Sequence, residues 1–119
     1  MALETRLRAE EAYYDMSKIT DKLYAQSKNG NNFYKLYELI ISEDNILLAY
    51  RNIKRNTGSN TKGTDGKTVK DYANIPMDEL VSLVRSRLAN FQPMSVRRVF
   101  IPKTNGKERP LGIPTFEDR

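Results

Sequence analysis

The chain has 119 residues, with no cysteine and no histidine, and its 20 basic and 15 acidic residues give a formal net charge of +5. Without cysteine there is no disulfide framework or thiolate chemistry, and without histidine the commonest metal ligand and general base is missing, so structural zinc is not expected. No apolar run approaches the roughly 20 residues that span a bilayer, and the N-terminus lacks a signal-peptide core. We therefore expect an intracellular protein with no membrane partner.

The charge is unevenly distributed along the chain. Residues 1–50 carry six Lys or Arg and eight Asp or Glu, whereas residues 51–119 carry fourteen and seven. A basic half of this kind favours a polyanionic partner, because Lys and Arg that neutralise phosphates release counterions. A soluble surface with excess lysine would give the same count.

Helices are predicted for the N-terminal part of the chain. Apolar residues at helical spacing predict a helix over residues 2–25, followed by a polar turn at 26–32. A second apolar stripe predicts a helix over 33–41. Ser42 is then expected to cap a third helix, whose first turn would hold two acidic residues near the positive end of the helix dipole.

A glycine-rich segment separates the third predicted helix from a fourth. Gly58 is a plausible stop for the third helix, and residues 56–66 contain almost no apolar residue. We expect a loop there that is mobile unless something binds it. Pro76 suits the first turn of a fourth helix, whose apolar stripe covers residues 80–91 and which ends before Pro93.

The C-terminal segment predicts a basic β-hairpin. Strand-forming residues occupy 96–101, and Asn105-Gly106 is a strong two-residue hairpin signal. Alternation puts Arg98 and Phe100 on one face and Arg97 on the other, with Val99 and Ile101. Arg97 and Arg98 are therefore not expected to serve one ligand.

The register of this hairpin decides which basic residues act together. With a strict two-residue turn, Lys103 faces Glu108, and Arg109 points to the opposite side. With a three-residue loop through Lys107, Lys103 lies across from Arg109. Two cations side by side cost energy unless an anion lies between them, so the second register would form a phosphate clamp.

The segment from residue 97 to residue 119 contains the elements RRVFIPK, RPLGIPT and DR. It closely resembles the start of the reverse transcriptase domain of group II intron-encoded proteins, and DNILLAYR at 44–51 and KGTDG at 62–66 extend the resemblance upstream. The resemblance implies an α+β fold in which about four N-terminal helices precede a basic β-hairpin, as an incomplete fingers subdomain. Residues 1–43 would be a helical extension, 44–92 a block of helix, loop and helix, and 93–119 the fingers hairpin, truncated before the palm.

The same resemblance implies the functional residues. In reverse transcriptases of this kind, residues at the positions of Lys103 and Arg109 contact the triphosphate of the incoming nucleotide. Phosphoryl transfer needs positioning and charge neutralisation more than covalent help, which suits a Lys and an Arg. The loop at 57–66 would form a lid over the template. We place contacts to intron RNA or template at Arg51, Lys54, Arg55, Lys62, Arg97 and Arg98.

The catalytic part of such an enzyme is not expected in this chain. Polymerases of this class bind two Mg²⁺ through carboxylates, typically an early Asp and a Tyr-x-Asp-Asp turn. Neither element occurs here, so we assign no catalytic or metal-binding residue and expect the chain alone to be inactive. Mg²⁺ and the deoxynucleotide would be bound by the full-length parent, in a ribonucleoprotein of the bacterial cytoplasm or of an organelle.

Two other interpretations fit the sequence. The chain could be a stand-alone module that binds structured RNA without catalysis, with salt-dependent affinity. It could also be a structural protein that forms a homodimer through an exposed sheet edge or its helices, since an unpaired strand edge tends to pair with a second copy.

Overall fold

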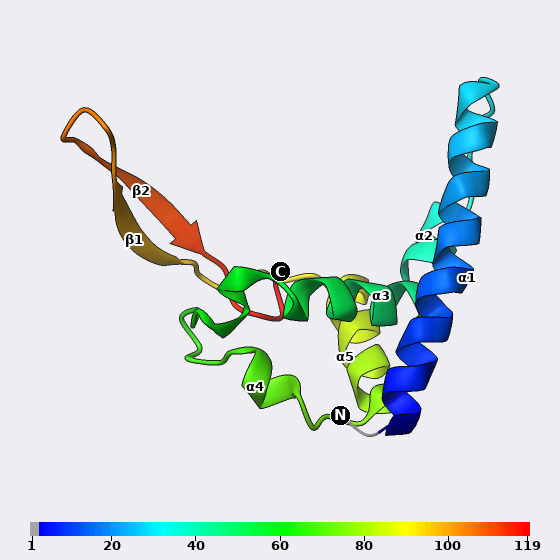
Figure 1. Cartoon of the computed structure of the whole chain (residues 1–119), viewed down its shortest axis with the longest axis horizontal. Coiled ribbons are helices and arrows are strands. Elements are labelled where there is room, and N and C mark those ends of the chain that lie inside the picture. The colour runs from blue at the N-terminus through cyan, green and yellow to red at the C-terminus, as the bar shows by residue number, and fades with distance from the viewer. Residues whose placement is uncertain (1–2) are drawn as a thin grey trace.

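The computed structural model describes residues 3–119, apart from the side chains of residues 3–6 and 9. Within this range it has five α-helices, one 3₁₀ helix and a two-stranded antiparallel sheet, which confirms the predicted α+β class. The elements are α1 (Leu3–Lys28), α2 (Leu36–Ile40), α3 (Glu43–Lys54), η1 (Thr57–Asn60), α4 (Val69–Tyr72), α5 (Met77–Ala89), β1 (Arg97–Pro102) and β2 (Glu108–Ile113). The hairpin projects from the helical body on the side away from α1 (Figure 1). Residue 2, where we expected the first helix to begin, lies outside the described residues.

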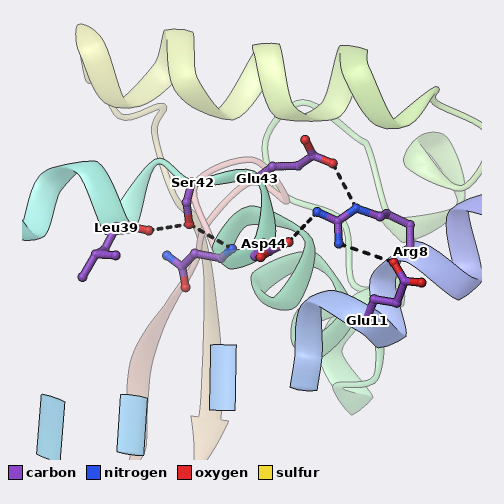
Figure 2. A network of polar contacts seen from close by, with 7 residues as sticks. Arg8, Glu11, Leu39, Ser42, Glu43 and Asp44 are labelled. Carbon is purple, nitrogen blue, oxygen red and sulfur yellow. Dashed lines mark hydrogen bonds and ion pairs between the residues drawn. The ribbon is translucent and has the colours of Figure 1, made fainter. Parts of the chain in front are cut away.

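The long helix α1 docks on α3 through its N-terminal half. Ala12 is fully buried and Met16 nearly so, whereas the second half of α1 extends beyond α3 (Figure 1). A guanidinium strengthens the contact, because Arg8 Nη2 lies 2.6 Å from Asp44 Oδ1 and Arg8 Nε lies 3.4 Å from Glu43 Oε1 (Figure 2). The hydrogen bond to Asp44 is the main reason that the pKa of Arg8 is raised. The acidic first turn of α3 therefore both complements the helix dipole and holds α1.

The start of α3 confirms the predicted cap. The backbone N–H of Asn45 donates to Ser42 Oγ at 3.3 Å, and the same hydroxyl donates to the carbonyl of Leu39 at 2.7 Å (Figure 2). The preceding helix spans Leu36–Ile40 rather than 33–41, and it starts late because Lys35 adopts a left-handed conformation with φ of 65°. A residue at positive φ cannot continue a right-handed helix.

Between the glycine-rich segment and α5 lies a short helix that was not predicted from the sequence. Thr68 caps α4 in a capping box with Asp71, whose carboxylate accepts from the Thr68 N–H at 2.7 Å. Pro76 lies one position before α5 rather than in its first turn, and α5 ends at Ala89, short of the predicted residue 91. About four helices were predicted, and α4 accounts for the fifth.

The core lies where α1, α3, α4 and α5 meet the segment that follows the hairpin. Its buried members are Ala12, Leu47, Tyr50, Tyr72, Leu80 and Phe116. The ring of Phe116 stacks on Tyr72 with centroids 4.8 Å apart and meets Tyr50 edge-on at 6.3 Å. The hairpin is thus anchored to the helices by an aromatic residue three positions after β2. No helix within residues 3–119 combines the length and apolarity needed to cross a bilayer.

Candidate nucleic-acid interface

The hairpin closes with a three-residue loop of Thr104, Asn105 and Gly106. The Lys103 N–H donates to the Lys107 carbonyl at 2.6 Å, and the Gly106 N–H donates to the Lys103 carbonyl at 3.2 Å. Gly106 has φ of 80°, the left-handed geometry that glycine adopts at the end of a type I turn followed by a bulge. Ile101 then pairs with Arg109 and Pro102 with Glu108, so neither register considered from the sequence is observed.

This register also accommodates the two prolines of the strands. Because Lys103 and Lys107 form a hydrogen-bonded pair, alternation makes the pairs Pro102 with Glu108 and Phe100 with Pro110 non-hydrogen-bonded. A proline there forfeits no ladder bond, since the N–H it lacks would point away from the partner strand.

The observed register still gathers basic side chains on one face of the tip. Lys103 lies opposite Lys107 and diagonal to Arg109, and by alternation all three share the face of Ile101. All three are exposed, and within the described part of the chain none of their side chains makes a hydrogen bond or ion pair. The neighbouring acid, Glu108, lies on the other face. This cationic tip (Lys103, Lys107 and Arg109) holds three like charges that only an external anion can neutralise.

The loop over residues 57–66 is fastened by Arg119. Its guanidinium donates to the carbonyls of Gly58 at 2.8 Å and Thr61 at 2.6 Å, and to the carbonyl of Pro114 at 3.2 Å. One side chain therefore joins two points of the loop to the segment after β2. Hydrogen bonds from a charged donor are stronger than those between neutral groups.

Three further contacts tie the same loop to the base of the hairpin. Arg97 Nε donates to the Lys62 carbonyl at 2.8 Å, and Thr64 Oγ1 donates to the Ser95 carbonyl at 2.8 Å. Gly63 lies so close to the segment after β2 that a Cβ at Gly63 would be 2.7 Å from the Cα of Thr115. The sequence predicted a loop that is mobile until something binds it, but the chain itself supplies the fastening, and Thr57–Asn60 forms a 3₁₀ turn.

A largely buried ion pair completes the base. Arg87 of α5 donates through Nη2 to Asp118, whose second carboxylate oxygen accepts from the Met94 N–H at 2.8 Å. Sequence reasoning assigned no role to Arg87, Asp118 or Arg119. The DR element was noted as part of the resemblance, but the acceptors of Arg119 are backbone carbonyls, which no residue pattern identifies.

The basic residues of α3 are partly engaged within the fold. The guanidinium of Arg51 stacks over the Tyr13 ring at 4.4 Å and so helps to hold α1, and Lys54 Nζ lies 5.7 Å from the Tyr50 ring. Arg55, at the C-cap of α3, is exposed, as are Lys62 and Arg98. Contacts of these predicted residues with RNA stay predictions.

Tyr72, near the base of the hairpin, has a strongly shifted pKa. Burial first, and the carboxylate of Glu117 second, raise its pKa to about 12. Its hydroxyl is buried and makes no hydrogen bond of normal distance and angle among the described residues, and the Glu117 carboxylate is the charge that acts on it most strongly. It borders a cavity of about 390 Å³ between α3 and α5 that is lined mainly by apolar side chains.

The described residues do not offer a site for the Mg²⁺ pair of a polymerase. They contain no group of three or more His, Cys, Asp or Glu side chains placed to hold a metal ion. Of the carboxylates near the hairpin base, Asp118 is occupied by Arg87 and by the Met94 N–H.

Comparisons with known proteins give a consistent set of relatives. The chain is 34% identical over 88 residues to the group II intron-encoded protein LtrA of Lactococcus lactis, covering 73% of this chain and 14% of that protein. It is 39% identical over 92 residues to protein YkfC of Escherichia coli, covering 71% and 23%. It is 31% identical over 105 residues to an uncharacterized 91 kDa protein in the cob intron of Schizosaccharomyces pombe, covering 83% and 12%. No family model matches, and the chain spans less than a quarter of each of these relatives.

Proposed function

The chain belongs to the family of group II intron-encoded proteins, and from this premise we propose that it supplies the nucleotide-clamping and RNA-gripping part of a reverse transcriptase and maturase. Lys103 and Arg109 bind the triphosphate of the incoming deoxynucleotide, and Lys107 adds a third positive charge. The carboxylates that bind Mg²⁺ come from outside these 119 residues. The assembly acts as a ribonucleoprotein with intron RNA, in the bacterial cytoplasm or in an organelle.

The observation that carries this proposal is a cationic tip on a hairpin whose base is hydrogen-bonded to the loop at 57–66. Three exposed cations share one face, and the described residues place no acid beside them on that face. Arginine offers a planar fork of donors to phosphate oxygens, and lysine a compact point charge. The tip therefore suits a polyphosphate, and the fixed base suits a site that must position it.

The test is carried out on a reverse transcriptase that contains this segment. Lys103→Ala and Arg109→Ala should each raise the KM for the deoxynucleotide about tenfold or more, because a charge-assisted contact to phosphate is lost. Lys22→Ala, at an exposed lysine of α1 far along the chain, is the matched control and should leave KM unchanged. Unchanged KM and kcat in both tip variants would remove the clamp assignment.

We also propose that RNA is bound by the cations Arg55, Lys62 and Arg98. The chain should bind intron RNA with an affinity that falls steeply with salt, and replacing any one of the three by Ala should reduce the salt slope by about one. Arg51 is a useful contrast, since its guanidinium already stacks on Tyr13. Binding of RNA with full affinity by a chain that lacks nucleotide clamping would instead favour the stand-alone RNA-binding module.

A homodimer through the hairpin stays a prediction. Within residues 3–119 each strand has one partner, so both outer edges of the sheet are open. Sedimentation of the chain at several concentrations tests it.

A further inference from the structure

The hairpin has a reverse face, on the other side of the sheet from the side chains of the cationic tip. The residues of this face are explained neither by nucleotide binding nor by the contacts between the hairpin base and the loop at 57–66. We propose that this face, formed by Arg98, Phe100, Pro110 and Gly112, is a stacking platform for a base of single-stranded nucleic acid. The proposal deepens the RNA-binding part of the proposed function, on which it rests. It does not depend on the nucleotide clamp, which uses the other face.

The platform is exposed, and its members other than Arg98 are apolar. Phe100 is 60% exposed and Val96, which precedes β1 on the same face, is 54% exposed. Pro110 lies opposite Phe100, and Gly112 lies opposite Arg98. A Cβ at Gly112 would be 2.9 Å from Val96 Cγ2, so this position has no room for a side chain beside Val96. An aromatic ring that is 60% exposed, on the same face as a position without a side chain, is accessible to a planar ligand.

Arg98 lies near the Phe100 ring, where it can bind the phosphate of a base stacked on that ring. Arg98 and Phe100 are two residues apart on one strand, which separates them by about 6 to 7 Å along the same face. Within the described residues the Arg98 guanidinium makes no hydrogen bond or ion pair. A base stacked on Phe100 would thus leave its own phosphate within reach of Arg98. Single-strand binding proteins combine the same two contacts, an aromatic face and a backbone cation.

The charge of the hairpin decides between nucleic acid and an apolar protein surface as the occupant. Residues 97–113 contain five basic residues and a single acidic one, Glu108. Glu108 shares the platform face but lies at the tip, across from Pro102 and away from Arg98. A partner approaching this hairpin meets a strongly positive field, which favours a polyanion.

The experiment uses the absence of tryptophan from the chain. Phe100→Trp introduces a single fluorophore on the platform, and Leu111→Trp introduces one on the opposite face at another exposed apolar position, as the matched control. Each variant of the 119-residue chain is titrated at low salt with a short single-stranded oligoribonucleotide while its fluorescence is recorded. Stacking should quench the fluorescence of Phe100→Trp and leave that of Leu111→Trp largely unchanged.

A second pair of variants measures the contribution of the ring to affinity. Phe100→Ala should weaken oligonucleotide binding about fivefold or more, as for other base-stacking aromatics, and Phe100→Tyr should restore it.

Two outcomes would overturn the platform. Binding with no quenching of Phe100→Trp, or with equal quenching in the two tryptophan variants, would remove it while leaving RNA binding intact. Failure of the chain to bind the oligonucleotide at all would also overturn it, together with the RNA-binding part of the proposed function. An unchanged deoxynucleotide KM in Lys103→Ala and Arg109→Ala, with quenching of Phe100→Trp preserved, would contradict only the clamp.

Discussion

The base and the tip of the same hairpin are held in opposite ways. At the base, Phe116 is buried against Tyr72, and Arg119 bonds to three carbonyls from two segments. At the tip, Lys103 and Arg109 are exposed, and their side chains have no partner among the described residues. A rigid base fixes where the cations stand, and the open tip keeps their charge available for a ligand. Stability and binding should therefore be separable by mutation.

The largest expected effect is a difference in the free energy of unfolding between substitutions at Phe116 and at Phe100. Phe116→Ala should lower the free energy of unfolding by about 3 to 5 kcal/mol, because it empties an aromatic site in the core. Phe100→Ala, on the exposed hairpin face, should change it by no more than about 0.5 kcal/mol. Urea unfolding followed by circular dichroism measures both. Equal losses at the two positions would break the distinction between base and tip.

The next effect concerns the fastening of the loop. Arg119→Met keeps the aliphatic length but removes the donors, and should cost about 1 to 3 kcal/mol. Hydrogen exchange of the backbone amides at 57–66 should accelerate in this variant and not in Arg98→Met, the control at the reverse face. Unaltered exchange in the Arg119 variant would mean that Gly63 and Arg97 suffice to hold the loop.

A smaller effect, of opposite sign, is expected at Tyr72. Its buried hydroxyl makes no hydrogen bond of normal geometry among the described residues, so Tyr72→Phe should raise the free energy of unfolding by about 1 kcal/mol at neutral pH. The folded pKa of about 12 exceeds the ordinary value of 10.0. The unfolded chain therefore loses this proton first, and stability should fall as pH rises from about 10 to 12.

Tyr72→Phe should remove part of that alkaline loss, leaving the part due to Tyr50, whose pKa burial also raises. Tyr34→Phe is the control, because Tyr34 is 84% exposed. Thermal unfolding from neutral pH to about pH 11 measures both variants across the lower part of this range. A loss of stability at neutral pH in Tyr72→Phe would show that the hydroxyl has a favourable partner.

The smallest change in stability is expected at the tip. The double variant Lys103→Ala with Arg109→Ala should alter the free energy of unfolding by less than about 0.5 kcal/mol, and in the favourable direction, since like charges are removed. Its affinity for inorganic triphosphate, measured by calorimetry, should nevertheless fall. A marked loss of stability would show that the tip cations also support the fold.

Local features of this fold could be predicted because their signals are local. Ser42 caps α3 as its position before two acidic residues indicates, and Asn105-Gly106 marks the turn of the hairpin. The capping box of Thr68 and Asp71 was equally readable and would have revealed α4. The loop length was harder, because Gly106 suits both a two-residue turn and the third position of a longer one.

The hydrogen bonds of Arg119 at the hairpin base could not be predicted from the sequence, for a physical reason. Arg119 recognises the carbonyls of Gly58, Thr61 and Pro114, which every residue type carries. Lys35 likewise adopts positive φ, although lysine gives no sign of it in sequence.

The cationic tip was only partly predictable. The shared face of Lys103 and Arg109 was expected from alternation in one of two registers, and the resemblance favoured that register. That Lys107 lies opposite Lys103 could be known only from the observed register. A loop one residue longer or shorter would place the Lys107 side chain opposite a different residue.

The reach of Arg119 also sets an order of events during synthesis. Its acceptors lie 61 and 58 residues earlier in the chain, at Gly58 and Thr61. While a ribosome is still adding the hairpin, the glycine-rich loop is already made but the guanidinium of Arg119 is not. Helix contacts within the first 54 residues can form early, because they are close in sequence. The bonds from Arg119 must form last, whereas those from Arg97 and Thr64 need no residue after 97, so a pause in translation before residue 119 would leave the loop held without its Arg119 bonds.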